Sequence, residues 1–153
     1  MIMREPMAHF ATFARLHDAR PTDVPALRAL SDGLPAGRGG ERPVWPLLVE
    51  AQGAHILVAT ECQVPVGAVV VWHRKDAAEA RLAWLGVAPS ARGRGVGSLL
   101  LQTAIATAAT HRADTMTIRL PAEAAQLAQF LLDAGFVQEK GGGLRLLGGR
   151  IVP

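Results

Sequence analysis

The sequence has no tyrosine, a single cysteine, Cys62, and only two lysines, Lys75 and Lys140. A lone cysteine cannot form a disulfide within the chain, and such low cysteine usage is typical of the reducing cytoplasm. No apolar run approaches the roughly 18–20 residues that a membrane-spanning helix needs. The first six residues include Arg4, Glu5 and Pro6, so they lack the uninterrupted apolar segment of a secretory signal. We therefore expect a cytoplasmic protein that does not enter a membrane.

The charge pattern does not favour binding to nucleic acid. The isoelectric point is 10.0, but the formal net charge is only +3. Apart from the two lysines, the 16 basic residues are arginines, and they are scattered along the chain rather than clustered on one segment. We predict no nucleic-acid partner.

Two further kinds of chemistry lack their residue patterns. The histidines share no metal-ligand spacing with one another or with the cysteine, so the sequence predicts no metal site; they are His9, His17, His55, His73 and His111. The serines do not occur in a G-x-S-x-G motif, which argues against a serine hydrolase; they are Ser31, Ser90 and Ser98.

The length of 153 residues and the 50% content of hydrophobic residues indicate one globular domain. We expect residues 1–9 to be an N-terminal extension and residues 10–153 to form the domain. Residue patterns predict strands at 10–17, 55–61, 66–73, 81–87, 115–120, 136–140 and 144–147. They predict helices after Thr22 or Asp23 as the cap, at 44–51, at 96–111 and from Pro121 to Ala134, with a long irregular segment at 31–43. The order is βααβββαβαββ, and the right-handed crossover rule makes strands 81–87 and 115–120 parallel.

Residues 82–101 form the most informative stretch of the chain. An apolar strand leads through Pro89 and the glycines Gly93 and Gly95 into a helix that has no charged residue before His111. The first N–H groups of a helix have no internal partner, and the helix dipole is positive there, so this turn favours an anion. Because glycines allow close approach and Arg92 and Arg94 add charge, a diphosphate is the expected ligand.

The spacing separates this turn from two common nucleotide loops. The dinucleotide motif G-x-G-x-x-G fails because positions 98 and 100 are Ser98 and Leu100. The G-x-x-x-x-G-K-[ST] loop fails because no lysine follows the glycines. The pattern that remains is Arg92-x-x-Gly95-x-Gly97, preceded by Val87-x-Pro89.

This pattern, with its strand, its helix and the downstream elements, resembles the acyl-coenzyme A signature [RQ]-x-x-G-x-[GA] of the GNAT superfamily of N-acyltransferases. The resemblance covers roughly residues 10–148. It implies an α/β (α+β) GNAT fold: a mixed central sheet of about six to seven strands with helices on both faces, in which strands 81–87 and 115–120 splay apart. It also implies acetyl-CoA, or another short acyl-CoA, as cofactor, with an amine acceptor and no covalent acyl-enzyme.

The resemblance assigns roles to individual residues. The pantetheine arm would pair with the strand backbone, the diphosphate would bind the turn, and the helix after Pro121 would line the other side. These residues are Leu85, Gly86 and Val87; Arg92, Gly93, Arg94, Gly95, Val96, Gly97 and Ser98; and Leu127 and Phe130. The backbone N–H of Val87 would stabilise the tetrahedral oxyanion.

The catalytic side chains are less defined. The tyrosine that many relatives use as an acid corresponds here to Leu131, and their asparagine after the strand at 115–120 is replaced by Leu120-Pro121. A thiol pKa near ~8.5 lets the thiolate leave as the anion. The position at which some relatives keep a glutamate base is Arg81.

Two groups near the strand ends are candidates for the base. Glu79 precedes Arg81 by two residues, and His73 ends the neighbouring strand; the pattern favours an ordinary solvated residue at a strand end for each of them over a base. Arg81 could instead bind an acidic acceptor. The acceptor pocket would come from residues 20–55, 73–81 and the C-terminal hairpin. The alternative function is an acyl-CoA-binding regulatory or sensor module without transferase activity, and we expect a monomer or homodimer.

Overall fold

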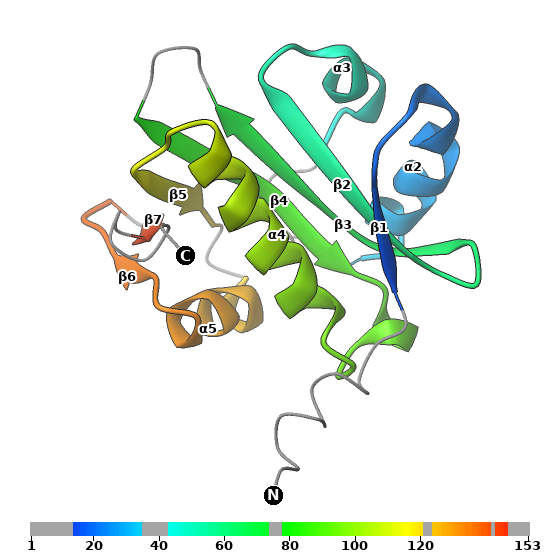
Figure 1. The fold of residues 1–153 in the computed structure, drawn as a ribbon. Helices are drawn as coiled ribbons and strands as arrows, with labels where there is room; N and C mark the ends of the chain where they lie inside the picture. The colour runs from blue at the N-terminus through cyan, green and yellow to red at the C-terminus, as the bar shows by residue number, and fades with distance from the viewer. Residues whose placement is uncertain (1–13, 35–42, 74–77, 121–123, 142, 147–153) are drawn as a thin grey trace, which may run out of the picture.

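The computed structural model describes residues 14–34, 43–73, 78–120, 124–141 and 143–146. Its centre is a seven-stranded sheet with the strand order β1-β2-β3-β4-β5-β7-β6 (Figure 1). The sheet is mixed and carries helices on both faces, which confirms the predicted GNAT-type architecture. None of the helices within the described ranges combines the length and apolarity that crossing a bilayer requires.

The first four strands form an antiparallel series: β1 (Arg15–Asp18), β2 (Ala54–Glu61), β3 (Val64–His73) and β4 (Glu79–Val87). The predicted hairpin between β2 and β3 is confirmed, but its turn is tighter than the four residues expected from the sequence. Only Cys62 and Gln63 connect the strands, and both have positive φ, 51° and 68°. Two left-handed residues match the twist that a two-residue hairpin requires.

The strands β4 and β5 separate from each other along the second half of β4, which leaves a gap in the sheet. β4 pairs in parallel with β5 (Thr115–Arg119) only from Glu79 to Arg81. The β3–β4 register slips between Val70 and Val71, whose partners are Trp84 and Leu82, so Ala83 is the extra residue of a bulge. Because a bulge bends its strand, β4 turns away from β5 directly after their pairing ends. The predicted splayed parallel pair is confirmed.

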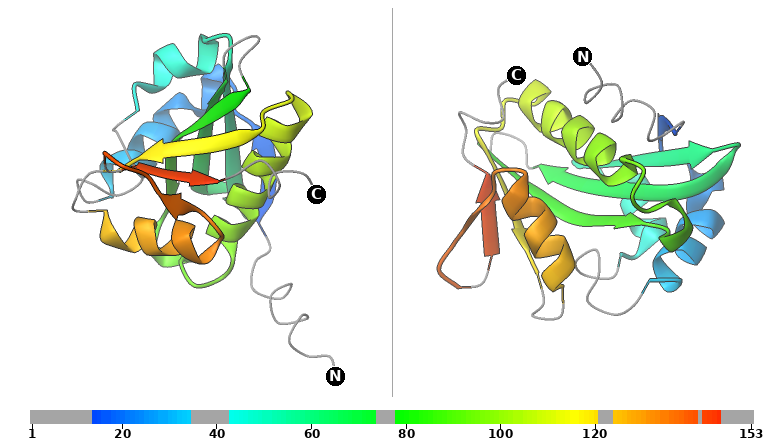
Figure 2. Two further views of the ribbon diagram at one scale, coloured as in Figure 1. Left: turned by 90° about the vertical axis from the view of Figure 1, so that its left-hand side faces the viewer. Right: turned by 90° about the horizontal axis from the view of Figure 1, so that it is seen from below.

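Two layers of helices cover the sheet (Figure 2). Helix α4 (Val96–Thr110) lies on one face, and α5 (Ala125–Asp133) lies near it beside β5. Helices α2 (Val24–Asp32) and α3 (Trp45–Glu50) cover the opposite face. Side chains along β3 point alternately to the two faces of the sheet and so contribute to both cores. Val69 and Val71 join the core under α4, while Val70 joins the core under α2 and α3.

The last two strands close the sheet beyond β5. β7 (Gly143–Leu146) lies antiparallel between β5 and β6 (Val137–Gln138). Gly135, with φ of 109°, ends α5 as predicted, because the N–H of Phe136 bonds to the carbonyl of Leu131. The predicted beginnings at Phe10 and Pro121 lie outside the described residues.

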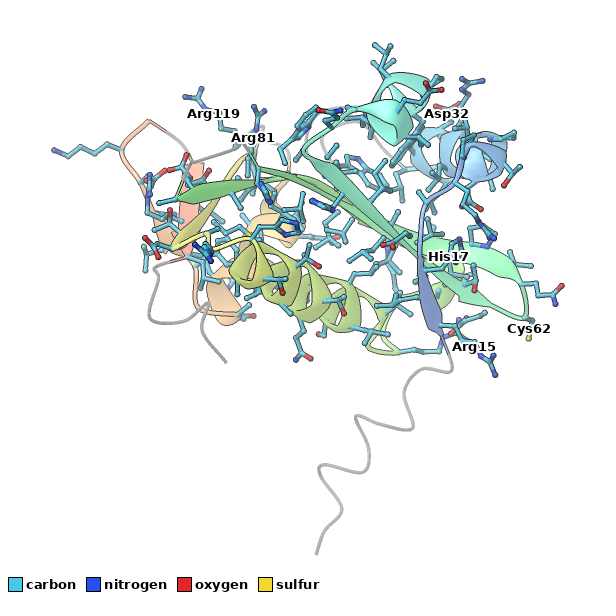
Figure 3. All side chains as sticks on the ribbon, turned by 45° about the horizontal axis from the view of Figure 1, so that its top comes forward. Arg15, His17, Asp32, Cys62, Arg81 and Arg119 are labelled. Carbon is cyan, nitrogen blue, oxygen red and sulfur yellow. The ribbon has the colours of Figure 1, made fainter. Side chains whose placement is uncertain are left out.

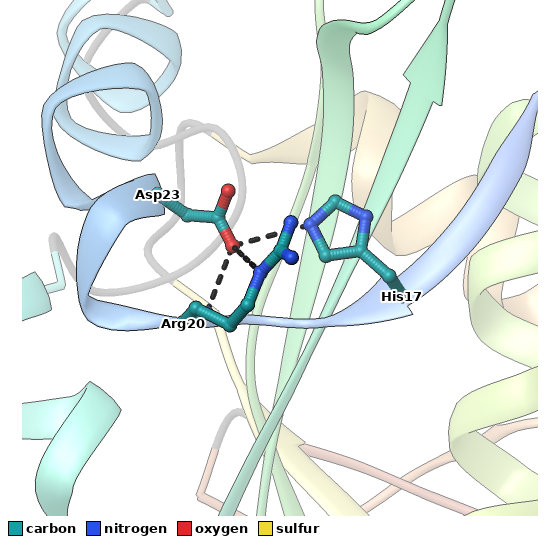
Figure 4. A network of polar contacts seen from close by, with 3 residues as sticks. All are labelled: His17, Arg20 and Asp23. Atoms are coloured by element: carbon teal, nitrogen blue, oxygen red, sulfur yellow. Dashed lines mark hydrogen bonds and ion pairs between the residues drawn. The ribbon is translucent and has the colours of Figure 1, made fainter.

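Asp23 is the N-cap residue of α2, one of the two caps that the sequence suggested, but its side chain makes no capping hydrogen bond to the helix. Its carboxylate turns back and accepts a 2.8 Å hydrogen bond from the backbone N–H of Arg20, and it lies 3.1 Å from Nε2 of His17 (Figure 4). Burial acts to raise the pKa of this carboxyl, but the backbone hydrogen bond from Arg20 and the contact with His17 lower it below its ordinary value. The residue therefore fixes the connection between β1 and α2 rather than the first turn of the helix.

Candidate functional site

A cavity of about 370 Å³ opens at the gap between β4 and β5. The end of β4, the glycine-rich turn, the start of α4 and one face of α5 form its walls. All residues predicted to bind the cofactor line this cavity, with the exception of Arg94. The sequence missed three lining residues: Leu34, Ala91 and Gln126.

The turn has the backbone geometry of an anion cradle. Gly93 and Gly95 adopt left-handed conformations with φ of 79° and 83°, and Gly95 is the N-cap of α4. The first helical hydrogen bond runs from the N–H of Leu99 to the carbonyl of Gly95 at 3.0 Å. The N–H groups of residues 96–98 precede that bond, so helix geometry leaves them without intrahelical acceptors. Together with the positive end of the helix dipole, they favour a phosphate.

The two arginines of the turn have different environments. Nε of Arg92 donates a 3.3 Å hydrogen bond to the carbonyl of Val87, which ties the turn to the end of β4. Nη2 of Arg94 forms an ion pair with the Glu61 carboxylate at 2.5 Å, because the end of β2 lies beside the turn. Arg92 therefore lines the cavity, whereas Arg94 is engaged outside it.

The end of β4 presents backbone groups to the gap. The N–H of Ala88 donates to the carbonyl of Val66 at 2.7 Å, toward β3. Since N–H groups alternate in direction along a strand, the N–H groups of Val87 and Leu85 point toward the gap. The backbone N–H expected to bind the oxyanion thus faces the cavity.

Close packing keeps the cavity narrow. A Cβ added at Gly97 would lie 3.6 Å from the Phe130 ring and 3.7 Å from Val87. A Cβ at Gly86 would lie 2.3 Å from the Trp84 ring, so only glycine fits there. Trp84 is held in turn by a T-shaped contact with Trp45, whose ring centroid is 5.4 Å away. The two tryptophans belong to the core under α2 and α3 and thus pack behind Gly86, on the face of the sheet opposite α4.

The two expected bases lie away from this cavity. Glu79 begins β4, and its carboxylate is 3.2 Å from Nη1 of Arg145. His73 ends β3 opposite Ala80, and its ring lies against His55 and His111. Eight residues of extended strand separate Glu79 from Val87, which is about 26 Å. The structure therefore does not bring either group to the predicted oxyanion donor.

A second cavity, of about 480 Å³, lies against the same strand on the α3 side. Its walls combine apolar and aromatic side chains with one guanidinium; among them are Leu47, Trp72, Arg81, Ala83 and Trp84. By strand alternation and the register of Arg81 with Thr117, Arg119 lies on this same face of the sheet. Figure 3 shows Arg81 and Arg119 pointing away from α4. This cavity falls in the region from which the sequence analysis expected the acceptor pocket.

The comparisons with known proteins agree with this geometry. A family model described as "Acetyltransferase (GNAT) domain" matches residues 52–138. No curated protein matches the chain at a significant level of sequence similarity. Solved structures share the fold at low identity. The ribosomal-protein-S18-alanine N-acetyltransferase from Escherichia coli is 15% identical with a TM-score of 0.74, over 89% of this chain and 94% of that one.

Two other solved structures show the same fold similarity. An acetyltransferase of the GNAT family from Staphylococcus aureus Mu50 is 14% identical with a TM-score of 0.75, over 88% of this chain and 98% of that one. N-acetylglutamate synthase from Neisseria gonorrhoeae, complexed with coenzyme A and N-acetyl-glutamate, is 17% identical with a TM-score of 0.74. The match to that synthase covers 90% of this chain and 35% of the synthase.

Proposed function

The chain belongs to the GNAT acetyltransferase family, and from this premise we propose that it moves an acetyl group from acetyl-CoA to a primary amine by direct transfer. One observation carries the proposal. The splayed end of β4, the Gly93–Gly95 turn and the amino end of α4 line one cavity of a size that suits a small-molecule substrate. In this proposal the turn binds the diphosphate, and the gap-facing backbone groups of Leu85 and Val87 pair with the pantetheine amides. Leu127 and Phe130 cover the arm from α5.

The proposed chemistry needs few side chains. The amine nitrogen attacks the thioester carbonyl carbon, and the N–H of Val87 stabilises the resulting oxyanion. The C–S bond then breaks, coenzyme A leaves as the thiolate, and the ammonium proton passes to water. Leu131 occupies the position at which many relatives have a tyrosine that acts as the general acid, and it is fully buried in the core. A thiolate with a pKa near ~8.5 leaves without that acid.

Deprotonation of the acceptor limits the rate in this scheme. An amine with a pKa near ~10.4 is mostly protonated at neutral pH, and only the neutral form attacks. Of the two bases expected from the sequence, only Glu79 is kept as a candidate here. Its carboxylate is half exposed, so it could receive the acceptor's proton through intervening water, which a substitution can test. His73 is assigned below to another site. The rate should therefore rise with pH through the titration of the acceptor itself.

We assign the second cavity to the acceptor. Arg81 lines it, and Arg119 lies on the same face, so the cavity favours an amine that also carries a carboxylate or another anion. Its tryptophan and leucine walls favour an apolar part between the two groups. The anionic group would also orient the amine toward the gap, since Arg81 is the last residue of β4 that pairs with β5.

Two measurements test these assignments in sequence. The first is thermal unfolding with and without acetyl-CoA, for which we expect a clear rise in Tm. The second is release of free thiol with paired amines that differ only in one anionic group, such as an amine whose apolar chain ends in a carboxylate and the corresponding carboxamide. We expect release with the anionic member to be at least tenfold faster.

Each result points to a different conclusion. If acetyl-CoA leaves Tm unchanged, the cofactor site is wrong. If neutral amines react as well as anionic ones, acetyl transfer stands and the acceptor assignment fails. If acetyl-CoA binds but a broad amine panel releases no thiol, the result favours the alternative that the missing tyrosine supports, an acyl-CoA-binding sensor module.

A further inference from the structure

Three histidines from three different elements meet at the carboxyl end of α4. His55 is the second residue of β2, His73 is the last residue of β3, and His111 directly follows α4. His55 lies opposite Val71, and alternation puts His73 on the same face as Val71, the face that α4 covers. The ring centroids are 4.2 Å apart for His73 and His111, 4.5 Å for His55 and His111, and 5.3 Å for His55 and His73.

Two hydrogen-bonding details make this cluster suitable for binding a ligand. Nε2 of His73 is buried and has no hydrogen-bond partner in the part of the chain that the structure describes. A buried polar atom without a partner is costly, so such an atom calls for an explanation. Nδ1 of His111 lies 2.9 Å from the carbonyl oxygen of Thr107. When Nδ1–H donates to that carbonyl, Nε2 keeps its lone pair, which is the arrangement found in metal-binding histidines.

The surroundings of His73 and His55 favour neutral imidazole rings. Burial, together with the proximity of His111, lowers the pKa of His73, and the same effects lower that of His55. Neutral imidazole is the form that binds a metal. The charge of Asp18 acts in the opposite direction on the pKa of His55. The negative end of the α4 dipole is also at this position.

We propose that His55, His73 and His111 bind one divalent transition-metal ion, and that Zn²⁺ suits the site best. Their donor nitrogens all lie within 4.8 Å of one another. Tetrahedral Zn²⁺ with Zn–N bonds near 2.0–2.1 Å needs nitrogens about 3.3 Å apart, so side-chain rotations that close the cluster by up to about 1.5 Å complete the geometry. Three imidazoles leave a fourth position for water, and imidazole is a preferred ligand of Zn²⁺, Cu²⁺ and Ni²⁺.

The site does not depend on the proposed acetyl transfer. Helix α4 has 15 residues, so its two ends are about 22 Å apart. The ion would join β2, β3 and the end of α4, three elements whose imidazole rings lie against one another at tilted angles. The sequence analysis predicted no metal site from spacing along the chain, and such spacing does not reveal a site whose ligands come from three separate segments.

The test uses the full chain without a histidine tag, stripped of metal with a chelator. Zn²⁺ is titrated by calorimetry, and Co²⁺ serves as a visible probe of a tetrahedral site. The variants are His111→Gln, which changes an exposed ligand, and His55→Gln. The control is His17→Gln, which makes the same substitution at a histidine on β1 outside the cluster. Unfolding in the presence of chelator verifies that each variant is folded.

We expect one Zn²⁺ per chain, a rise in Tm on metal addition, and a tetrahedral Co²⁺ spectrum. Loss of a direct ligand should weaken binding by about 100-fold or more, since loss of an outer-shell partner alone costs 10–100-fold. The His17 variant should bind as the wild type does. The proposal is overturned if the wild type does not bind Zn²⁺, or if His111→Gln and His55→Gln bind it as tightly as the wild type.

Discussion

The two ends of α4 carry sites built in opposite ways. At the amino end, the proposed anion site consists of backbone N–H groups from one continuous segment, the turn and the first residues of α4. At the carboxyl end, three side chains from β2, β3 and the residue after the helix lie together where we propose a cation site. The sign of the helix dipole agrees with the ligand at each end. A site made of backbone is encoded in contiguous residues, whereas a site made of side chains is encoded in the pairing of distant strands.

The largest expected effect comes from placing negative charge in the backbone cradle. Gly93→Glu should weaken acetyl-CoA binding by more than about 100-fold, because a carboxylate would face the diphosphate beside the N–H groups of α4. The measurement is the acetyl-CoA Kd from calorimetry, supported by the loss of the thermal shift.

A matched control separates charge from backbone strain in this experiment. Gly141 also has positive φ, 95°, and a Cβ there also meets no atom within 4 Å. It does not line the cofactor cavity, so Gly141→Glu should lose similar stability and keep full acetyl-CoA binding. Equal binding losses in both variants would contradict the placement of the cradle.

A smaller effect is expected from Arg81→Met, which should change binding of the acceptor without changing either of the sites proposed at the two ends of α4. Arg81→Met removes the guanidinium from the α3-side cavity and keeps most of the apolar stem. The KM of an anionic acceptor should rise by about 10–100-fold, in line with the loss of a charge-assisted hydrogen bond. The KM of acetyl-CoA should remain within about twofold. A rise in the acetyl-CoA KM instead would place Arg81 in the cofactor site.

The sequence predicted the features that local residue patterns determine. The alternation of apolar residues indicated the strands, and the glycine pattern correctly placed the turn at Gly93 and Gly95 before α4, because steric freedom and the helix N-terminus act locally. The crossover rule then gave the parallel pair of β4 and β5. The predicted start of β4 was wrong by only two residues, since the strand begins at Glu79 rather than at residue 81.

The sequence did not predict features that depend on register between distant segments. Leu34 reaches the cofactor cavity from the end of α2, next to an irregular segment that has no periodicity. Arg94 pairs with Glu61, 33 residues earlier, because the β2–β3 hairpin ends beside the turn. The three histidines are 18 and 38 residues apart in the chain and become neighbours only through the sheet and α4. No spacing rule contains that information.

Glu79→Gln should have a modest effect that tests the distance argument. A general base in contact with the amine contributes about 10²–10⁴-fold, so its loss would be large. Because Glu79 lies at the far end of β4 and pairs with Arg145, we expect kcat/KM to fall by less than tenfold. The pH profile should keep its rise with the acceptor's own pKa. A fall of 100-fold with a displaced profile would instead make Glu79 the base.

The smallest effect should come from Gly97→Ala, and it should improve stability. Gly97 is in the first turn of α4, where alanine favours the helix over glycine by about 0.5–1 kcal/mol. The added Cβ would meet Phe130 and Val87 at 3.6 and 3.7 Å, which are ordinary contact distances. We expect the free energy of unfolding to rise by that amount and the acetyl-CoA KM to change by less than about threefold. Since the cradle consists of N–H groups that alanine retains, a large loss of binding here would mean that the ligand contacts the Cα of Gly97 rather than the backbone N–H groups around it.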